Sequence, residues 1–404
     1  MVTRAKSGVF KPKTYLTATQ DLEPVSVKAA LVDTKWKMAM QDEYNALQKN
    51  GTWTLVPAET ATKLVGNKWV FRVKYNPNGS ISKYKAWLVA KGFHQTYGVD
   101  FFETFSPVVK PCTVRIVLSL AVMNCWPIRQ SDVNNAFLNC MLTEDVFMPQ
   151  PEGFTNSQFP NHVCKLHKAF YGLKQAPRAW YDRLKGSLVQ WGFRSSKSET
   201  SLFFKHIGCD VLIILVYVDD ILITVSSNVY ITEVISQLSS EFALKDLGDF
   251  NYFLGVEVTP SAEGLHLSQT KYVGDILRKA QMLGSKDWGS DPDDWRSIGG
   301  YCVYLGSNLV SWSSKKQNII SRSSVESEYR ALALAMSEVL WITYLLKELK
   351  VSLHKPLALH CDNNSAEALV SNPNSNQLAD VLTKPLSFDH FAYMRTKLNV
   401  CPRP

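Results

Sequence analysis

Two adjacent acidic residues interrupt the most apolar stretch of this chain. Asp219 and Asp220 follow Tyr217-Val218 and stand between two runs of mostly β-branched residues, 211–215 and 221–225. Runs rich in Val and Ile predict strands, and two runs with so short a break predict a hairpin. Two carboxylates at the edge of an apolar sheet repel each other unless a cation lies between them. The pattern favours a divalent-cation site, and an acidic turn capping an ordinary hairpin is the alternative.

Length and composition indicate a globular chain of two or three domains. The 404 residues are 46% hydrophobic and 20% charged, which excludes a disordered chain. Lys and Arg exceed Asp and Glu by 44 to 36, a formal charge of +8. This excess fits a polyanionic partner, although many soluble enzymes carry as much. Basic residues near the start predict a flexible basic arm over 1–24.

Targeting signals and metal-binding cysteine patterns are not evident in the sequence. No apolar core follows the basic start, and the run 211–218 is too short to cross a bilayer. We therefore expect no membrane partner and an intracellular protein, in a cytoplasmic particle or the nucleus. The eight cysteines form no Cys-x-x-Cys pair. We expect buried free thiols and no disulfides.

The order of predicted elements indicates an α+β fold with an antiparallel sheet, because helices and hairpins mix without a regular βαβ alternation. In the first part of the chain, helices are predicted over 23–50, 114–123, 171–192 and 231–242, and strands over 69–73, 81–90, 127–132, 211–225 and 252–258. A second unit begins near Trp288. It contains predicted strands over 301–320, a long helix over 325–349, a strand over 357–361 and a short helix over 365–370.

Five sequence blocks resemble, in order, the reverse transcriptase of plant copia-type LTR retrotransposons. They are Lys85–Phe93, Glu103–Val109, Ser131–Leu138, Tyr171–Trp180 and Tyr217–Asp220. The resemblance runs from Lys11 to the segment 379–385. It implies reverse transcriptase fingers, palm and part of a thumb over 25–278. It also implies an RNA template, a DNA or RNA primer and dNTPs as partners, and it leaves the oligomeric state open.

The resemblance makes Asp132, Asp219 and Asp220 catalytic residues that hold two Mg²⁺ ions, with Mn²⁺ as a possible substitute. The chemistry gives independent support, because two-metal nucleotidyl transfer needs carboxylates from at least two separate elements. Asp132 ends a predicted strand far from Asp219 in sequence. A palm-like sheet would bring the two carboxylates together.

Further site residues follow from the resemblance alone. It assigns nucleotide binding to Lys85, Phe137, Gln175 and Tyr217, and the primer grip to Leu254 and Gly255. The ring of Phe137 would exclude a ribose 2′-OH, with core packing as the alternative. Taken singly, Lys85 fits a solvated surface lysine. Trp87 departs from the family, which has Arg at this position, and its single neutral N–H donor cannot replace a guanidinium.

The unit over 288–385 resembles an incomplete ribonuclease H domain, in which four acids would surround two Mg²⁺ ions. Glu328 and Asp362 match two of these acids, although a surface helix position and a helix N-cap are the respective alternatives. The first acid falls on Ser285, with Asp287 displaced by two residues. The final acidic block is absent, so we expect ribonuclease H activity to be lost.

The chain resembles a deletion-bearing copy of the family or the product of an incorrectly spliced gene. The junction 279–287 is too short for a thumb and connection, and the tail 386–404 follows a truncated unit. Two functions remain open: an RNA-directed DNA polymerase, and a relic that only binds nucleic acid. A DNA-dependent polymerase or primase is the third and weakest hypothesis, because nothing outside the reverse transcriptase blocks supports it.

Overall fold

The central element of the fold is a six-stranded antiparallel sheet. The computed structural model describes residues 23–75, 80–250, 252–254, 256–261, 264–269, 298–318, 324–353 and 355–361. The sheet has the order β11-β4-β10-β9-β8-β7. Its strands are β4 (Ile128–Val133), β7 (Arg194–Ser195), β8 (Leu202–Ile207), β9 (Asp210–Tyr217), β10 (Asp220–Val225) and β11 (Leu244–Asp249). This arrangement confirms the predicted hairpin over 211–225 and the α+β class.

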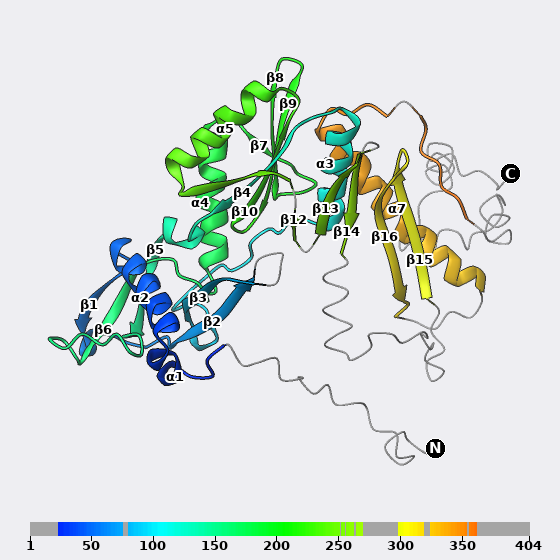
Figure 1. Cartoon of the computed structure of the whole chain (residues 1–404). Helices are drawn as coiled ribbons and strands as arrows, with labels where there is room; N and C mark the ends of the chain where they lie inside the picture. Colours follow the sequence, from blue (N-terminus) through cyan, green and yellow to red (C-terminus); the bar gives the residue numbers. More distant parts are fainter. Residues whose placement is uncertain are drawn as a thin grey trace, which may run out of the picture.

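Both faces of the central sheet are buried, which explains why β9 is apolar throughout instead of alternating. Leu212, Ile214 and Val216 face one core, which also contains α4 (Ala176–Gln190) and α5 (Asn228–Glu241). Ile213 and Leu215 face a second core with α3 (Pro111–Met123). Figure 1 shows α4 and α5 on one side of the sheet and α3 on the other. The predicted helix over 171–192 begins only at Ala176.

The N-terminal part packs a helix on a hairpin next to a small sheet. The hairpin joins β2 (Asn67–Tyr75) and β3 (Ile81–Ala90), and α2 (Thr34–Lys49) lies on it. Trp36 of α2 packs edge-on against Phe71 and Tyr84 of the hairpin, with ring centroids 5.4 and 5.0 Å away. A three-stranded sheet in the order β1-β6-β5 completes this part. Its strands are β1 (Trp53–Pro57), β5 (Met141–Pro149) and β6 (His162–Lys168).

The single helix predicted over 23–50 is wrong, because the chain leaves helical geometry at Asp33. This residue has φ −81° and ψ 119°, and its carboxylate accepts a hydrogen bond from Lys35 N at 2.8 Å. An Asp in this conformation caps a new helix instead of continuing the old one. The segment therefore forms α1 (Val27–Val32) followed by α2.

The later part of the chain contains two small antiparallel sheets and one long helix. β12 (Tyr252–Phe253), β13 (Val256–Ser261) and β14 (Gly264–Ser268) form one sheet, and β15 (Ile298–Leu305) and β16 (Asn308–Lys316) form the other. α7 (Ser324–Glu348) follows. The strand predicted over 252–258 is interrupted, because Leu254 takes the left-handed φ of +52°. Residues 365–370 lie outside the described residues.

The strand predicted over 357–361 is wrong, since only Leu359 forms an isolated bridge there. A short apolar run becomes a strand only when a neighbouring strand pairs along its length. The expected buried thiols are correct for Cys112, Cys140 and Cys164, whereas the other free cysteines of the described residues are at least partly exposed.

The stretch Glu326–Glu348 of α7 is long and apolar enough, by length and composition, to cross a bilayer. Core helices of soluble proteins pass the same test. In this structure Ile342, Leu345 and Leu346 of α7 are buried in the second core.

A close backbone approach joins the end of β3 to the segment before α4. Ala90 N donates a hydrogen bond to Tyr171 O at 2.7 Å, and Gly172 has φ +92°. A Cβ at Gly172 would lie 2.1 Å from Ala90 O. A side chain there is excluded both by the backbone conformation and by the lack of space.

We predict that Gly172→Ala lowers the free energy of unfolding by about 3 kcal/mol or more, because backbone must move to admit the methyl group. Gly186→Ala is the matched control, since a Cβ at Gly186 inside α4 meets nothing within 4 Å. This control should stabilise the protein by about 1 kcal/mol. Urea unfolding measures both effects, and an equal response of the two variants would contradict the close approach.

Candidate active site

Three carboxylates lie at one end of the central sheet. Asp132 on β4 is the direct cross-strand partner of Asp220 on β10, and Asp219 occupies the turn between β9 and β10. The turn is strained, because Val218 has φ +55°. Two hydrogen bonds hold it: Trp180 Nε1 donates to Val218 O at 2.6 Å, and Val133 N donates to Asp219 O at 2.9 Å.

The charged forms of Asp132 and Asp220 are destabilised at this site. Burial raises the pKa of Asp220 to about 6, and the charges of Asp219 and Asp132 add to this effect. Burial and Asp219 also raise the pKa of Asp132, while Lys85 opposes the rise. Among the residues that the structure describes, no three acidic, His or Cys side chains are arranged to hold a metal ion as they stand. The raised pKa values of Asp132 and Asp220 indicate excess negative charge at this site.

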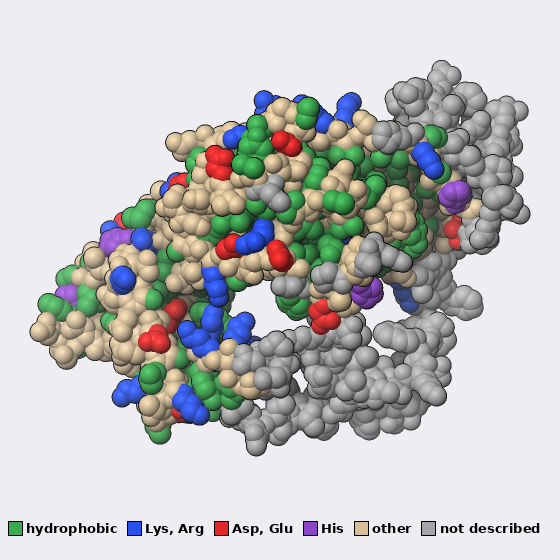
Figure 2. Space-filling view, turned by 45° about the horizontal axis from the view of Figure 1, so that its top comes forward, with side chains coloured by type: hydrophobic (Ala, Val, Ile, Leu, Met, Phe, Trp, Pro, Cys, Tyr) green, Lys and Arg blue, Asp and Glu red, His purple; other side chains and the backbone are tan. Residues whose placement is uncertain are grey.

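One face of the β2–β3 hairpin is basic. Lys74 pairs with Lys83, and Arg72 with Lys85, so these four side chains share a face. Burial and the charges of Lys74 and Lys83 lower the pKa of Lys85, whereas Asp132 opposes the change. Lys85 thus lies within electrostatic reach of Asp132. Figure 2 shows Lys and Arg side chains gathered beside a hollow, with acidic side chains on its opposite rim.

Phe137 and Tyr171 form an aromatic pair next to the carboxylates. Phe137 lies in the short helix η3 (Ala136–Asn139) and is buried, with its ring centroid 4.5 Å from that of Tyr171. The Tyr171 hydroxyl donates to Asp219 Oδ2 at 3.4 Å. Burial and the charge of Asp219 raise the pKa of Tyr171, so the hydroxyl remains a donor. Tyr217, the cross-strand neighbour of Asp220, is partly buried against the second core.

The side chain of Gln175 is buried and hydrogen-bonded to other parts of the protein. Its side-chain oxygen accepts from Gln95 Nε2 at 2.9 Å, and its Nε2 donates to Asp100 O at 3.0 Å. Gln95 Oε1 in turn accepts from Lys174 N at 2.8 Å. The amide of Gln175 therefore joins the loop after β3 to the start of α4. In this structure it contributes to positioning the hairpin relative to the central sheet.

Two of the remaining predicted site residues, Leu254 and Glu328, lie among the described residues. Leu254 lies between β12 and β13 and packs against the second core, and Gly255 is outside the described residues. Glu328 is partly exposed near the start of α7. Asp287 and Asp362 also lie outside the described residues.

Sequence reasoning missed the contacts that hold the carboxylate turn. Tyr171 and Trp180 are the first and last residues of one recognised block, so the block itself was the available signal. Nothing in the spacing indicates that one of them donates to a carboxylate and the other to a backbone carbonyl. Gln95 lies outside the recognised blocks and carries no comparable signal.

Comparison with known proteins identifies the family. Residues 50–289 match the family described as reverse transcriptase (RNA-dependent DNA polymerase). The whole chain aligns at 37% identity with the retrovirus-related Pol polyprotein from transposon RE1 of Arabidopsis thaliana and spans 37% of that protein. It aligns at 30% identity with the Pol polyprotein from transposon TNT 1-94 of Nicotiana tabacum, over 91% of this chain and 36% of the relative. The chain belongs to the reverse transcriptase family.

These relatives confirm the predicted resemblance to a plant copia-type Pol polyprotein, of which the chain spans little more than a third. The alignment with the Arabidopsis protein has 536 positions, more than the 404 residues of this chain. The relative therefore has residues within the aligned span that this chain lacks. A solved foamy viral protease–reverse transcriptase in complex with double-stranded DNA aligns with a TM-score of 0.38 and 12% identity, over 92% of this chain and 70% of that one.

We predict that Asp220→Asn stabilises the protein above pH 6 in the absence of divalent cations. The folded-state pKa of about 6 lies above the ordinary 3.8, so the folded state binds the extra proton between these values. The contribution of Asp220 to the free energy of unfolding therefore falls as the pH rises through this window. After solvent screening, the variant should gain about 1–2 kcal/mol at neutral pH and nothing below about pH 4.

Urea unfolding at a series of pH values measures this gain. Asp249→Asn is the control, because this side chain lies on the same sheet and is 92% exposed. An Asp220→Asn gain that does not change with pH would contradict the proposed repulsion among the carboxylates.

Proposed function

We propose that this chain is an RNA-directed DNA polymerase of retrotransposon origin that extends a primer with dNTPs. The observation that carries the proposal is the pairing of Asp132 with Asp220 beside Asp219. It supplies carboxylates from two separate elements at one end of a rigid sheet, as two-metal nucleotidyl transfer requires. The family membership supports the same reaction in general.

The donor set suits Mg²⁺, with Mn²⁺ as a substitute. Carboxylate oxygens are hard ligands, and the raised pKa values of Asp132 and Asp220 mark a negative charge that a cation would neutralise. Protein Mg²⁺ sites commonly use one or two carboxylates and complete their coordination with water and substrate phosphates. We infer that Asp132, Asp219 and Asp220 would hold two ions. The ions would activate the attacking oxygen and stabilise the leaving phosphate.

Side chains around the carboxylates would position the substrates. The basic face of the hairpin, with Lys85 closest to the acids in electrostatic terms, would bind triphosphate or template phosphates. Tyr171 would hold the orientation of Asp219 through its hydroxyl. Phe137, packed on Tyr171, would border the sugar of the incoming nucleotide and exclude its 2′-OH. The partners in this proposal are an RNA template, a DNA or RNA primer and dNTPs.

Two observations favour a second function, a nucleic-acid-binding relic without catalysis. Trp87 stands where the resemblance implies Arg, and the chain lacks residues that its relatives have within the aligned span. We further propose that ribonuclease H activity is lost, because the chain lacks the final acidic block of the pattern and has Ser285 at the first acid. Primer extension separates the two functions, because both bind template but only the polymerase extends a primer.

We predict that Asp219→Asn and Asp132→Asn each reduce primer extension by roughly a thousandfold or more, because each removes a metal ligand from the reacting centre. Template affinity should remain nearly unchanged, since it arises mainly from basic residues on phosphates. Extension of a labelled primer on an RNA template and a parallel filter-binding assay measure the two effects.

Asp249→Asn serves as the control and should extend normally. Near wild-type extension by either catalytic variant would refute the assignment of the site. Template binding without extension by the wild-type protein would instead favour the relic.

We also predict that Trp87→Arg raises catalytic efficiency about ten- to hundredfold, since a charged hydrogen bond to a phosphate contributes about 1.5–3 kcal/mol. Trp87 lies on the same strand face as Lys85, whose Nζ is 5.3 Å from the Trp87 ring centroid. The gain should appear at limiting dNTP, with unchanged affinity for primer–template. Trp87→Gln is the uncharged control and should show no gain. No gain in a folded Trp87→Arg variant would mean that Trp87 does not limit the reaction.

A further inference from the structure

The elements β15, β16 and α7, here called the C-terminal unit, share one hydrophobic core with α3 and the central sheet. All three lie after residue 289, where the match to the family ends. Val310 of β16 and Leu345 of α7 are fully buried in the same core as Ile116 of α3 and Leu215 of β9. Figure 1 shows α3 between the central sheet and the C-terminal unit. The expected domain boundary at 279–287 therefore separates two parts that share one core.

Two stacked cations join α3 to the C-terminal unit. The Arg115 guanidinium lies 3.8 Å from the ring centroid of Trp312 on β16 and donates to Val310 O at 3.2 Å. Lys110, just before α3, places its Nζ 4.1 Å from the ring centroid of Trp341 on α7. Cation–π contacts at such distances are favourable, most of all where water is partly excluded. They join the start and the first half of α3 to the unit.

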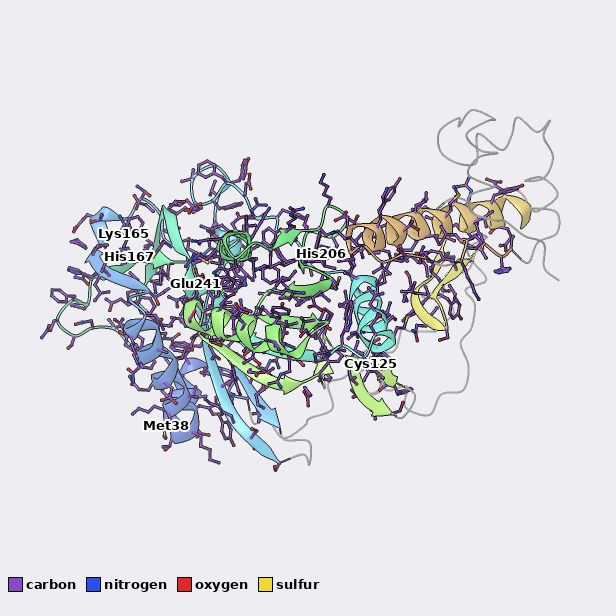
Figure 3. All side chains as sticks on the ribbon, turned by 90° about the horizontal axis from the view of Figure 1, so that it is seen from above. Met38, Cys125, Lys165, His167, His206 and Glu241 are labelled. Atoms are coloured by element: carbon purple, nitrogen blue, oxygen red, sulfur yellow. The ribbon has the colours of Figure 1, made fainter. Side chains whose placement is uncertain are left out.

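The end of α7 is fastened to the loop between β7 and β8. The Glu348 carboxylate accepts from Lys197 N at 2.8 Å, from Ser198 N at 3.1 Å and from Ser198 Oγ at 2.6 Å. Burial would raise the pKa of Glu348, but these hydrogen bonds outweigh it and lower the pKa. Trp341 Nε1 donates to Ser198 O at 2.9 Å. Figure 3 shows the C-terminal end of α7 beside the labelled His206 of β8.

The same loop also holds α3. Glu199, which is buried, accepts from Lys110 N at 3.3 Å and from Thr113 Oγ1 at 3.1 Å. Ser196 Oγ accepts from Ser198 N and Glu199 N at 3.1 and 3.0 Å, which fixes the loop itself. The loop 196–199 thus binds α7 on one side and α3 on the other. Buried groups that are paired in this way are costly to separate.

We propose that the C-terminal unit is a structural support of the central sheet. That this role replaces nuclease activity rests on the loss of ribonuclease H activity proposed above. Together with α3 the unit completes the core on the face of β9 opposite α4 and α5, and β9 leads directly into the turn that carries Asp219 and Asp220. Glu348 and Trp341 are positioning residues in this arrangement. Interfaces between parts of a chain move by default unless they are large and hydrophobic, and this one has a continuous apolar core. The proposal concerns folding and does not depend on polymerase activity.

Hydrogen exchange of β9 amides in the full chain tests the proposal. Glu348→Ala should reduce the protection of residues 210–217 by about tenfold or more, because it removes charged hydrogen bonds that tie α7 to the sheet. Glu348→Gln keeps one oxygen acceptor and should restore part of the protection. Trp341→Phe, which removes the Nε1 donor and places a smaller ring under Lys110, should give a smaller loss of the same kind. Each variant should unfold with the C-terminal unit and sheet in one transition.

Glu326→Ala is the matched control, because Glu326 lies on the same helix and pairs with Arg330, four residues further on. It should leave the protection of β9 unchanged. Unchanged β9 protection in Glu348→Ala and Trp341→Phe would overturn the proposal. Cleavage of an RNA–DNA hybrid by the wild-type chain that disappears in Glu328→Gln would also overturn it. Neither result concerns primer extension. A failure of the support proposal can therefore be distinguished from a failure of the proposed polymerase function.

Discussion

The repulsion among Asp132, Asp219 and Asp220 is the constraint on which the rest of the structure depends. Three carboxylates are held at one end of a buried sheet, where desolvation and mutual charge raise the pKa of two of them. The fold must hold this arrangement against its own electrostatic cost. It does so with two-sided burial of β9 and β10, the Trp180 hydrogen bond to the turn and the Val133 hydrogen bond to Asp219. The turn that carries Asp219 also has a strained backbone at Val218, and such strain is typical of functional sites.

Segments that are far apart in the sequence meet at the end of the central sheet that carries the carboxylates. The β2–β3 hairpin brings Lys85 near Asp132, and its end is joined to the segment before α4 by the Ala90–Tyr171 hydrogen bond. That segment carries Tyr171, which donates to Asp219. On the opposite face of the sheet, α3 and the C-terminal unit complete the core. Support of the site therefore extends beyond residues 50–289, which match the reverse transcriptase family.

Much of the site could be predicted because its signals are local. The apolar runs beside Asp219 and Asp220 predicted the hairpin, and Asp132 was expected at the end of a strand. The cross-strand pairing of Asp132 with Asp220 depends on register, which apolar runs without alternation do not specify. Two contacts depend on partners far away in sequence: the hydrogen bond between the buried amides of Gln175 and Gln95, and the hydrogen bonds from the loop 197–198 to the Glu348 carboxylate. The break at Asp33 has a local cause, since Asp is a favoured helix cap, but the apolar periodicity conceals it.

Primer extension by the wild-type chain, measured during a titration of Mg²⁺ on an RNA template, tests the central claim most directly. If the carboxylate edge is a two-metal polymerisation centre, extension should be absent with a chelator, rise with Mg²⁺ and reappear when Mn²⁺ replaces it. Binding of the template should change little across the same titration. A chain that binds template tightly but extends no primer at any concentration of either metal would contradict the account.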